Sequence, residues 1–168
     1  MIKTENLVLS PVSHGDLDIY SKILSSDELT KFLPKGQAYT DAEIQQHVEN
    51  RIEHWNHGFG SYVISLKSEP KTKIGYVGVE HCENPEFSDI RYALVSGYQG
   101  RGYVFEAAKA ALEQTFRANK HSKIYGVAFK ENLPSLAIIK KLGMIPEPEV
   151  KLYGDVDGLE IYAIEKFI

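Results

Sequence analysis

Hydrophobic and polar positions along this chain follow two periods, and these periods predict its strands and helices. Apolar runs or alternations predict strands at residues 6–12, 61–66, 73–81, 90–95 and 124–129. Apolar positions at helical spacing predict helices at residues 13–24, 40–57, 103–118 and 134–143. A final hairpin is expected from Val150–Tyr153 and Leu159–Phe167. This order of elements predicts one α/β domain, residues 1–168, with a mixed, mostly antiparallel sheet.

Residues at the ends of the predicted helices support these bounds. Thr40 is followed three residues later by Glu43, which is the pattern of a capping box. Pro134 is tolerated in the first turn of a helix. Gly143 suits the left-handed position that often follows a helix C-terminus.

The composition is that of an ordinary globular protein. Of the 168 residues, 43% are hydrophobic and 25% are charged, close to the soluble average. The single cysteine, Cys82, excludes an internal disulfide framework, and no run approaches the ~20 apolar residues of a membrane span. The net charge of -4 argues against nucleic acid as the main partner. The N-terminus shows no secretory signal, so we expect a cytoplasmic protein, either monomer or homodimer.

The segment Gln99–Val104 carries the strongest chemical signal. It lies between the predicted strand at 90–95 and the helix at 103–118, so it leads into a helix N-terminus. The first N–H groups of a helix lack intrahelical partners and carry partial positive charge, which favours phosphate binding. Gly100 and Gly102 let the backbone approach a bulky ligand, and Arg101 adds a forked cation. Taken alone, the segment is more typical of an ordinary strand-to-helix turn than of a phosphate site.

The residues around the loop exclude two other phosphate-binding motifs. A Walker loop has Gly-Lys followed by Ser or Thr, which is absent here. A dinucleotide fingerprint has a third glycine where this chain has Phe105. The wider sequence context must therefore decide what the loop binds.

Several segments, in chain order, resemble the GNAT superfamily of acetyl-coenzyme A-dependent N-acetyltransferases. The family signature is Gln or Arg, two free positions, Gly, one free position, then Gly or Ala. It corresponds here to Gln99–Val104, with Val104 in place of the small last residue. Further likenesses are Phe87–Ile90, Phe129–Ser135 and Leu142–Met144. The opening, Thr4–Leu9, is similar to the ribosomal-protein N-terminal acetyltransferase subgroup.

This resemblance implies a GNAT-like sheet flanked by helices, with a splayed strand pair that holds acetyl-coenzyme A, the cosubstrate. The backbone at the end of one strand would pair with the pantetheine arm, and the loop would bind the pyrophosphate. The implied cofactor-binding residues are Leu94, Val95, Gln99, Gly100, Arg101, Gly102, Tyr103, Val104, Asn132 and Ser135. Asn132 also suits a helix N-cap, and Tyr103 also suits a core position.

Acetyl transfer to an amine requires a base for the ammonium proton, donors for the oxyanion and an acid for the departing thiolate. By resemblance, Asp89 is the first candidate for the base and Glu80 the second. Ser135 would bind coenzyme A or protonate the thiolate. Each residue also has a structural interpretation. In it, Asp89 is a solvated charge at a strand end and Glu80 is a charge at a sheet edge. Ser135 is then a first-turn serine that bonds to the backbone of its helix.

No metal site is expected. The reaction needs neither a metal nor a covalent intermediate, so Cys82 is interpreted as a packed small residue. The 6 histidines lack the paired spacing with carboxylates that zinc sites show.

The acceptor is expected to be a primary amine, as the resemblance implies. An α-amine at a protein or peptide N-terminus, such as that of a ribosomal protein, is favoured by the resemblance to that subgroup and because its pKa is about 7.7–8.0, against about 10.4 for lysine. The alternatives are an acetyltransferase of a small amine (polyamine, amino acid or antibiotic), a non-catalytic coenzyme A sensor, and an interaction domain without cofactor.

Overall fold

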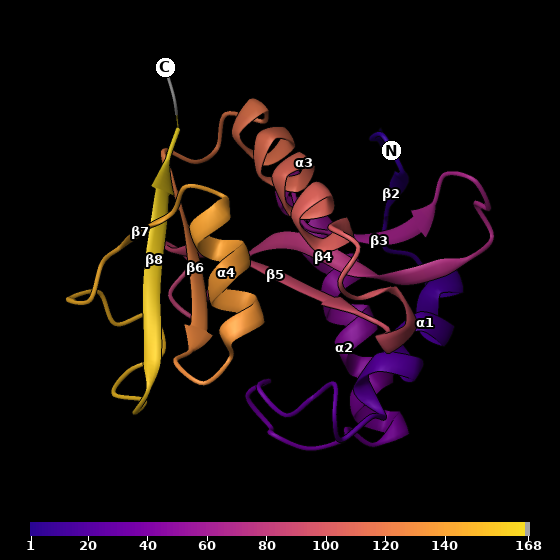
Figure 1. Cartoon of the computed structure of the whole chain (residues 1–168), viewed down its shortest axis with the longest axis horizontal. Coiled ribbons are helices and arrows are strands. Elements are labelled where there is room, and N and C mark those ends of the chain that lie inside the picture. Colours follow the sequence, from indigo (N-terminus) through magenta and orange to yellow (C-terminus); the bar gives the residue numbers. More distant parts are fainter. Residues whose placement is uncertain (167–168) are drawn as a thin grey trace.

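The computed structural model describes residues 1–166, and Figure 1 shows the arrangement of the elements. The strands are β1 (Ile2–Lys3), β2 (Leu7–Pro11), β3 (Ser61–Leu66), β4 (Lys73–His81), β5 (Ser88–Leu94), β6 (Lys123–Phe129), β7 (Ile145–Pro146) and β8 (Leu159–Glu165). The α-helices are α1 (Leu17–Leu24), α2 (Asp41–His54), α3 (Tyr103–Arg117) and α4 (Leu133–Lys141). The 3-10 turns are η1 (His14–Asp16), η2 (Trp55–His57) and η3 (Ser96–Tyr98). None of the helices in this range combines the length and the apolar composition that a membrane span requires.

The strands form one 8-stranded sheet in the order β1-β2-β3-β4-β5-β6-β8-β7. Every neighbouring pair is antiparallel except β5 and β6, which confirms the predicted mixed, mostly antiparallel sheet. β5 and β6 pair only where Asp89 lies opposite Tyr125. The two strands then separate (Figure 1). The Gly-rich loop follows β5 and α4 follows β6, so their starts lie beyond the separated strand ends.

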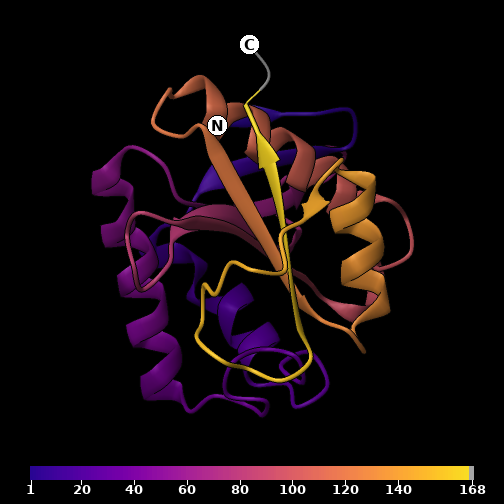
Figure 2. The same cartoon turned by 90° about the vertical axis from the view of Figure 1, so that its left-hand side faces the viewer.

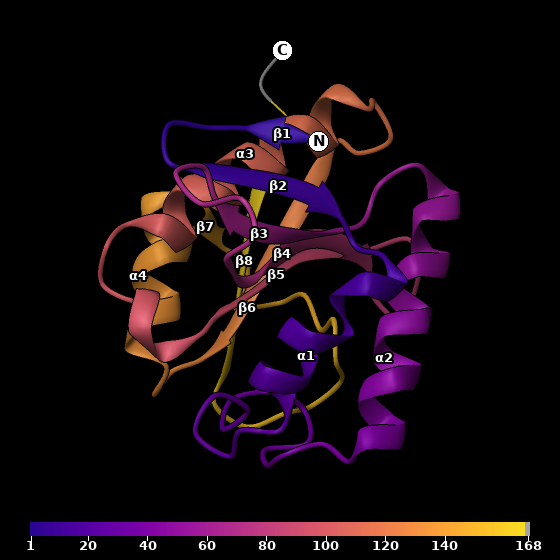
Figure 3. The same ribbon diagram turned by 90° about the vertical axis from the view of Figure 1, so that its right-hand side faces the viewer.

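The helices lie on both faces of the sheet. α3 and α4 are on one face, and α1 and α2 are on the other (Figures 2 and 3). Ala107, Ala108 and Ala111 on α3 are fully buried, and their small side chains let this helix pack closely on β4 and β5. On the other face, the buried ring of Tyr20 stacks on Tyr76 of β4 at 4.9 Å. Apolar cores on both faces therefore fix β4 and β5.

The capping signals in the sequence are confirmed. The Thr40 hydroxyl accepts a hydrogen bond from Glu43 N at 3.2 Å, and Glu43 Oε1 accepts one from Thr40 N at 3.0 Å. Pro134 lies in the first turn of α4. Gly143 follows that helix with φ of 87°, a conformation that a side chain would disfavour. Local side-chain and backbone chemistry therefore sets these helix ends.

The prediction of a strand at Val150–Tyr153, the first half of the C-terminal hairpin, is wrong. Residues 150–153 form no strand, because β8 already pairs with β6 on one side and with β7 on the other. The preceding residues run as a loop, and Tyr153 in this loop turns toward β5. Phe167, the predicted end of the hairpin, lies outside the described residues. β1 was not predicted, because two residues are too few to show a period.

Candidate active site

The Gly-rich loop presents open backbone at the N-terminus of α3. Gly100 and Gly102 have φ of 77° and 81°, the left-handed region in which glycine is favoured. A Cβ built at either position would meet nothing within 4 Å, so the space in front of the loop is free for a ligand. Gly102 is the N-cap of α3, and no side chain within the described residues caps this helix. Its first-turn N–H groups are therefore available to an anion.

The other loop residues hold this backbone in place. Gln99 Nε2 donates to the Leu94 carbonyl at 3.2 Å, which ties the loop to the end of β5. Tyr103 and Val104 are half-buried and pack against the core, so the larger residue at the last signature position is accommodated by packing. Arg101 is exposed, with its guanidinium 5.6 Å from the centre of the Tyr98 ring. The arrangement suits a polyanion such as a pyrophosphate.

A side-chain contact beyond the point of separation links β5 to α4, the helix that follows β6. The Tyr92 hydroxyl on β5 lies 2.8 Å from Ser135 Oγ on α4. Asn132 Oδ1 accepts from Ser135 N at 3.4 Å, so the predicted N-cap at Asn132 is present. Burial raises the pKa of Tyr92 to about 12, which keeps its hydroxyl protonated at neutral pH. Leu94 and Val95 are buried at the end of the same strand.

On the face of the sheet that carries α1 and α2, Glu80 forms a buried ion-paired cluster. Glu80 is only 6% exposed. Its Oε2 contacts the guanidinium of Arg51 from α2 and lies 3.3 Å from Arg91 Nη1. Its Oε1 accepts from Ser61 Oγ at 2.8 Å. Burial alone would raise the pKa of Glu80, but the two guanidinium groups outweigh it and lower that pKa.

Asp89 extends this cluster along β5. It lies opposite Glu80 in the sheet and is 3% exposed. Its Oδ1 accepts from Arg91 Nε at 2.9 Å, and its Oδ2 accepts from the hydroxyl of Tyr153. Burial, followed by the charge of Asp89, raises the pKa of Tyr153, so this hydroxyl stays a donor. We call the set Glu80, Arg51, Arg91, Asp89 and Tyr153 the charge network.

The structure thus places Asp89 and Glu80 side by side on neighbouring strands. Ser135 lies on α4, which covers the opposite face of the sheet from α2 (Figure 2). Cys82 is buried, and its pKa is raised to about 11 by burial and by Asp89, as expected of a packed thiol. Sequence reasoning missed Tyr92, Arg91 and Tyr153. The sequence does contain one signal for Arg51, because this charged residue falls on the apolar face of α2.

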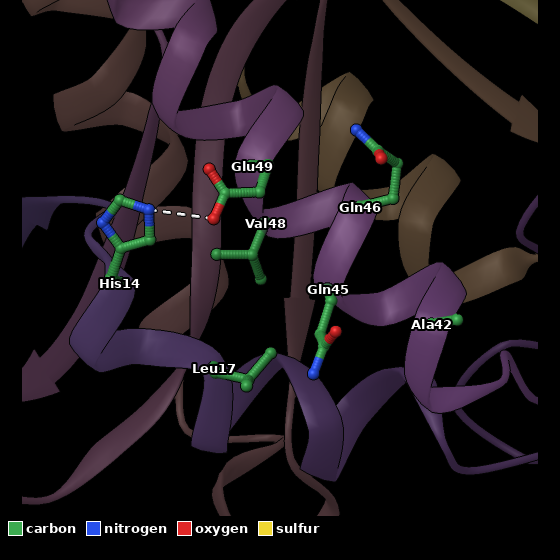
Figure 4. A pocket seen from close by; sticks show the side chains of 7 residues that line it. All are labelled: His14, Leu17, Ala42, Gln45, Gln46, Val48 and Glu49. Carbon is green, nitrogen blue, oxygen red and sulfur yellow. Dashed lines mark ion pairs between the residues drawn. The ribbon is translucent and has the colours of Figure 1, made fainter.

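A separate surface pocket of about 410 Å³ lies between α1 and α2 (Figure 4). Its lining residues are His14, Leu17, Ala42, Gln45, Gln46, Val48 and Glu49. His14 Nε2 and Glu49 Oε1 form an ion pair of 2.9 Å across it, and both side chains are largely exposed. None of the sequence-predicted site residues lies there.

Comparison with known proteins agrees with the geometry of the loop and the splayed strands. Residues 6–145 match the family described as "Acetyltransferase (GNAT) domain". The chain therefore belongs to the GNAT acetyltransferase family, and its class of activity is that of an acyltransferase. It is 26% identical over 145 residues to the uncharacterized N-acetyltransferase YnaD of Bacillus subtilis (strain 168), covering 85% of this chain and 81% of the relative.

Two solved structures share the fold at lower identity. RimL, a ribosomal L7/L12 alpha-N-protein acetyltransferase in complex with coenzyme A, is 19% identical with a TM-score of 0.78, covering 96% of this chain and 95% of its own. Spermidine N-acetyltransferase from Vibrio cholerae, in complex with coenzyme A and spermine, is 17% identical with a TM-score of 0.78. That match covers 96% of each chain.

Proposed function

We propose that this chain transfers an acetyl group from acetyl-coenzyme A to the α-amino group at the N-terminus of a protein or peptide. The observation that carries this choice of acceptor is the charge balance of the network. Glu80 and Asp89 are both paired with guanidinium groups, which leaves neither carboxylate free to hold a polycation. A singly charged acceptor amine suits such a site better than a polyamine does.

The cosubstrate would lie along the loop and the splayed strands, and it supplies the acetyl thioester. The N–H groups at the start of α3 and the Arg101 side chain would bind its phosphates. The backbone of Leu94 and Val95 would pair with its pantetheine arm. The remaining proposed contacts are those of Gln99, Gly100, Gly102, Tyr103, Val104, Asn132 and Ser135.

Asp89 is the proposed base, and Tyr153 would carry the proton to it. The Tyr153 hydroxyl donates to Asp89 Oδ2, and Tyr153 is 37% exposed, so it connects a buried carboxylate with the surface. In this relay, the hydroxyl passes its proton to Asp89 as it receives one from the ammonium. Glu80 is the weaker candidate, because two guanidinium groups hold its pKa low.

Ser135 is proposed to supply the proton that the departing thiolate takes up. Its Oγ lies 2.8 Å from the Tyr92 hydroxyl, which can replace that proton. Ser135 stands at the first turn of α4, beside the separated strand ends where the pantetheine arm would end. The hydroxyl pair therefore lies on the cofactor side and the charge network on the acceptor side.

The free amine also costs less to form at an N-terminus. With a pKa of about 7.7–8.0, an α-amine loses its proton at neutral pH for about 1 kcal/mol, whereas a lysine requires ~3 kcal/mol more. The less basic α-amine therefore demands less of the carboxylate that accepts its proton through Tyr153.

Mass spectrometry of acetylated peptides tests the acceptor. One peptide carries a free N-terminus and internal lysines, and its matched control has the same sequence with a blocked N-terminus. We expect acetylation of the first peptide at its α-amine and none of the control. Label on lysines alone, or only on a polyamine offered in competition, would contradict the proposal. The second candidate, a polyamine acetyltransferase, is favoured by the likeness to the spermidine enzyme, and the same competition decides between them.

A further inference from the structure

The first turn of α3 carries an acidic side chain, Glu106, and the segment between β1 and β2 receives it. Glu106 Oε1 accepts hydrogen bonds from Thr4 Oγ1 at 2.5 Å and from Asn6 N at 2.7 Å. Glu106 Oε2 accepts a third from Asn6 Nδ2 at 2.9 Å. The donors are a hydroxyl, a backbone N–H and a side-chain amide. The segment therefore surrounds one carboxylate with groups that suit it.

This segment is itself fastened to the sheet. Thr4 N donates to the Leu7 carbonyl at 3.0 Å, and Leu7 N donates to Thr4 Oγ1 at 3.1 Å. Lys67, directly after β3, donates from Nζ to the Thr4 carbonyl at 2.9 Å and from N to the Asn6 carbonyl at 2.8 Å. Leu7 is fully buried at the start of β2. Glu106 thus connects the start of α3 to the β2–β3 part of the sheet (Figure 3).

The packing of α3 gives this connection a role in setting where the helix begins. The buried side chains nearest the Gly-rich loop are all alanines, at Ala107, Ala108 and Ala111. A methyl group inserts little between the side chains of a sheet, so such a face permits close approach and opposes sliding weakly. The polar bonds of Glu106 supply a fixed point at this end of the helix.

The same bonds keep an anion away from the helix N-terminus. Gly102 caps α3 without a side chain, so the first-turn N–H groups are the ones that the loop presents to a ligand. A carboxylate close to these groups repels a second anion, because like charges repel. Both oxygens of Glu106 are instead turned to Thr4 and Asn6. The contact therefore fixes the binding turn and leaves it open to phosphate.

We propose that Glu106 is a positioning residue for the cosubstrate: its bonds to Thr4 and Asn6 hold the first turn of α3 where its N–H groups meet the pyrophosphate of acetyl-coenzyme A. The inference rests on the cofactor site of the proposed function and adds the segment before β2 to it. Removal of Glu106 has two effects of opposite sign. Loss of a negative charge strengthens the binding of an anion, and loss of the fixed point weakens it. The second effect is the larger, since three donors already offset the charge.

The test is the dissociation constant of coenzyme A, measured by calorimetric titration of the folded proteins. We expect roughly 10-fold weaker binding in Glu106→Ala, and a higher KM for acetyl-coenzyme A with kcat close to the wild type. Glu106→Gln, which keeps one acceptor oxygen, should lie between the two. The matched control is Glu113→Ala, which removes an exposed glutamate about two turns further along α3 and should leave the dissociation constant unchanged.

Asn6→Ala tests the contact from its other side. It removes the side-chain donor to Glu106 Oε2 at an exposed position, so the fold and the carboxylate remain. We expect weaker binding of coenzyme A in the same direction as in Glu106→Ala. This variant decides the question if Glu106→Ala does not fold.

A role in stability alone would lower the free energy of unfolding, measured with urea, and leave the dissociation constant of the folded variants unchanged. Equal affinity for coenzyme A in the wild type, Glu106→Ala and Asn6→Ala would therefore overturn the inference. Tighter binding in Glu106→Ala would also overturn it, because the charge would then outweigh the contact. Both results leave the proposed cofactor site intact. That site fails separately, and this inference with it, if the wild-type chain does not bind coenzyme A.

Discussion

The loop Gln99–Val104 follows the C-terminal end of β5, whereas Glu80 and Asp89 of the charge network lie at the opposite end of the β4–β5 pair, and the two regions differ in construction. The loop offers open backbone, and a Cβ at Gly100 or Gly102 would meet nothing. In the network, Glu80 and Asp89 are almost fully enclosed, and both carboxylates are committed to guanidinium or hydroxyl partners. A substitution in the loop should therefore affect ligand binding without a loss of packing, with backbone strain added at the positive φ of Gly100 and Gly102, whereas one in the network should affect both function and packing.

The largest expected effect is on turnover by Asp89→Asn. Loss of a general base lowers the rate by roughly 10²–10⁴-fold, and the deficit should shrink at high pH, where the free amine forms unaided. Steady-state kinetics over a range of pH measures this. Tyr153→Phe, which removes the proposed relay and keeps the carboxylate, should reduce turnover in the same direction. Unchanged turnover of Asp89→Asn near neutral pH would transfer the base role to Glu80.

Arg51→Ala should destabilise the fold by about 3–5 kcal/mol, because it leaves the buried Glu80 without its closest cation. Urea denaturation measures this free energy of unfolding. The matched control is Lys151→Ala, which breaks an exposed pair with Asp155 and should change stability by about 0–1 kcal/mol. Equal effects of the two substitutions would contradict the distinction between the network and the surface.

Gly102→Glu should abolish the stabilisation by acetyl-coenzyme A, because it places bulk and negative charge at the phosphate site. For the wild type, ligand at ~100 times its dissociation constant adds about 2.7 kcal/mol, measured as a thermal shift. Gly97→Ala is the control, since its Cβ would also meet nothing and its φ is not positive. An undiminished shift in a folded Gly102→Glu protein would exclude this loop as the cofactor site.

The smallest effect concerns the cap of α2, the helix that carries Arg51. Thr40→Ala should cost ~1 kcal/mol, because Glu43 N loses its acceptor at the helix N-terminus. Thermal or urea unfolding measures it, and Thr40→Ser, which keeps the hydroxyl, should be close to the wild type. A loss as large as that of Arg51→Ala would show that α2 depends on its cap more than on the buried ion pair.

The same contrast explains how far the sequence predicted the structure. The place of the loop between a strand and a helix, the starts of α2 and α4, and the strands β3 to β6 follow from local patterns, and the structure confirms them. The sequence indicates Glu80 and Asp89 as candidates, but it does not show that the arginine partners of Glu80 come from other elements, α2 and β5. Tyr153 was assigned to a strand, because the sequence does not show that β6 and β7 already occupy both sides of β8.

The pairing of Tyr92 with Ser135 was missed for a related reason. Each residue alone suits an ordinary strand or helix position, and only the separation of β5 from β6 brings the hydroxyl groups together. Local signals therefore identified which elements form, and tertiary pairing determined which side chains meet.

The single point of contact between β5 and β6 has a further consequence. Beyond Asp89, no strand of residues 1–166 pairs with the side of β5 turned away from β4, so this part of the molecule contains a sheet edge. An edge of this kind is a template for strand addition. Under the proposed function, the pantetheine arm, which carries amide groups, would occupy this edge as a surrogate strand and would extend the pairing of β5 beyond Asp89.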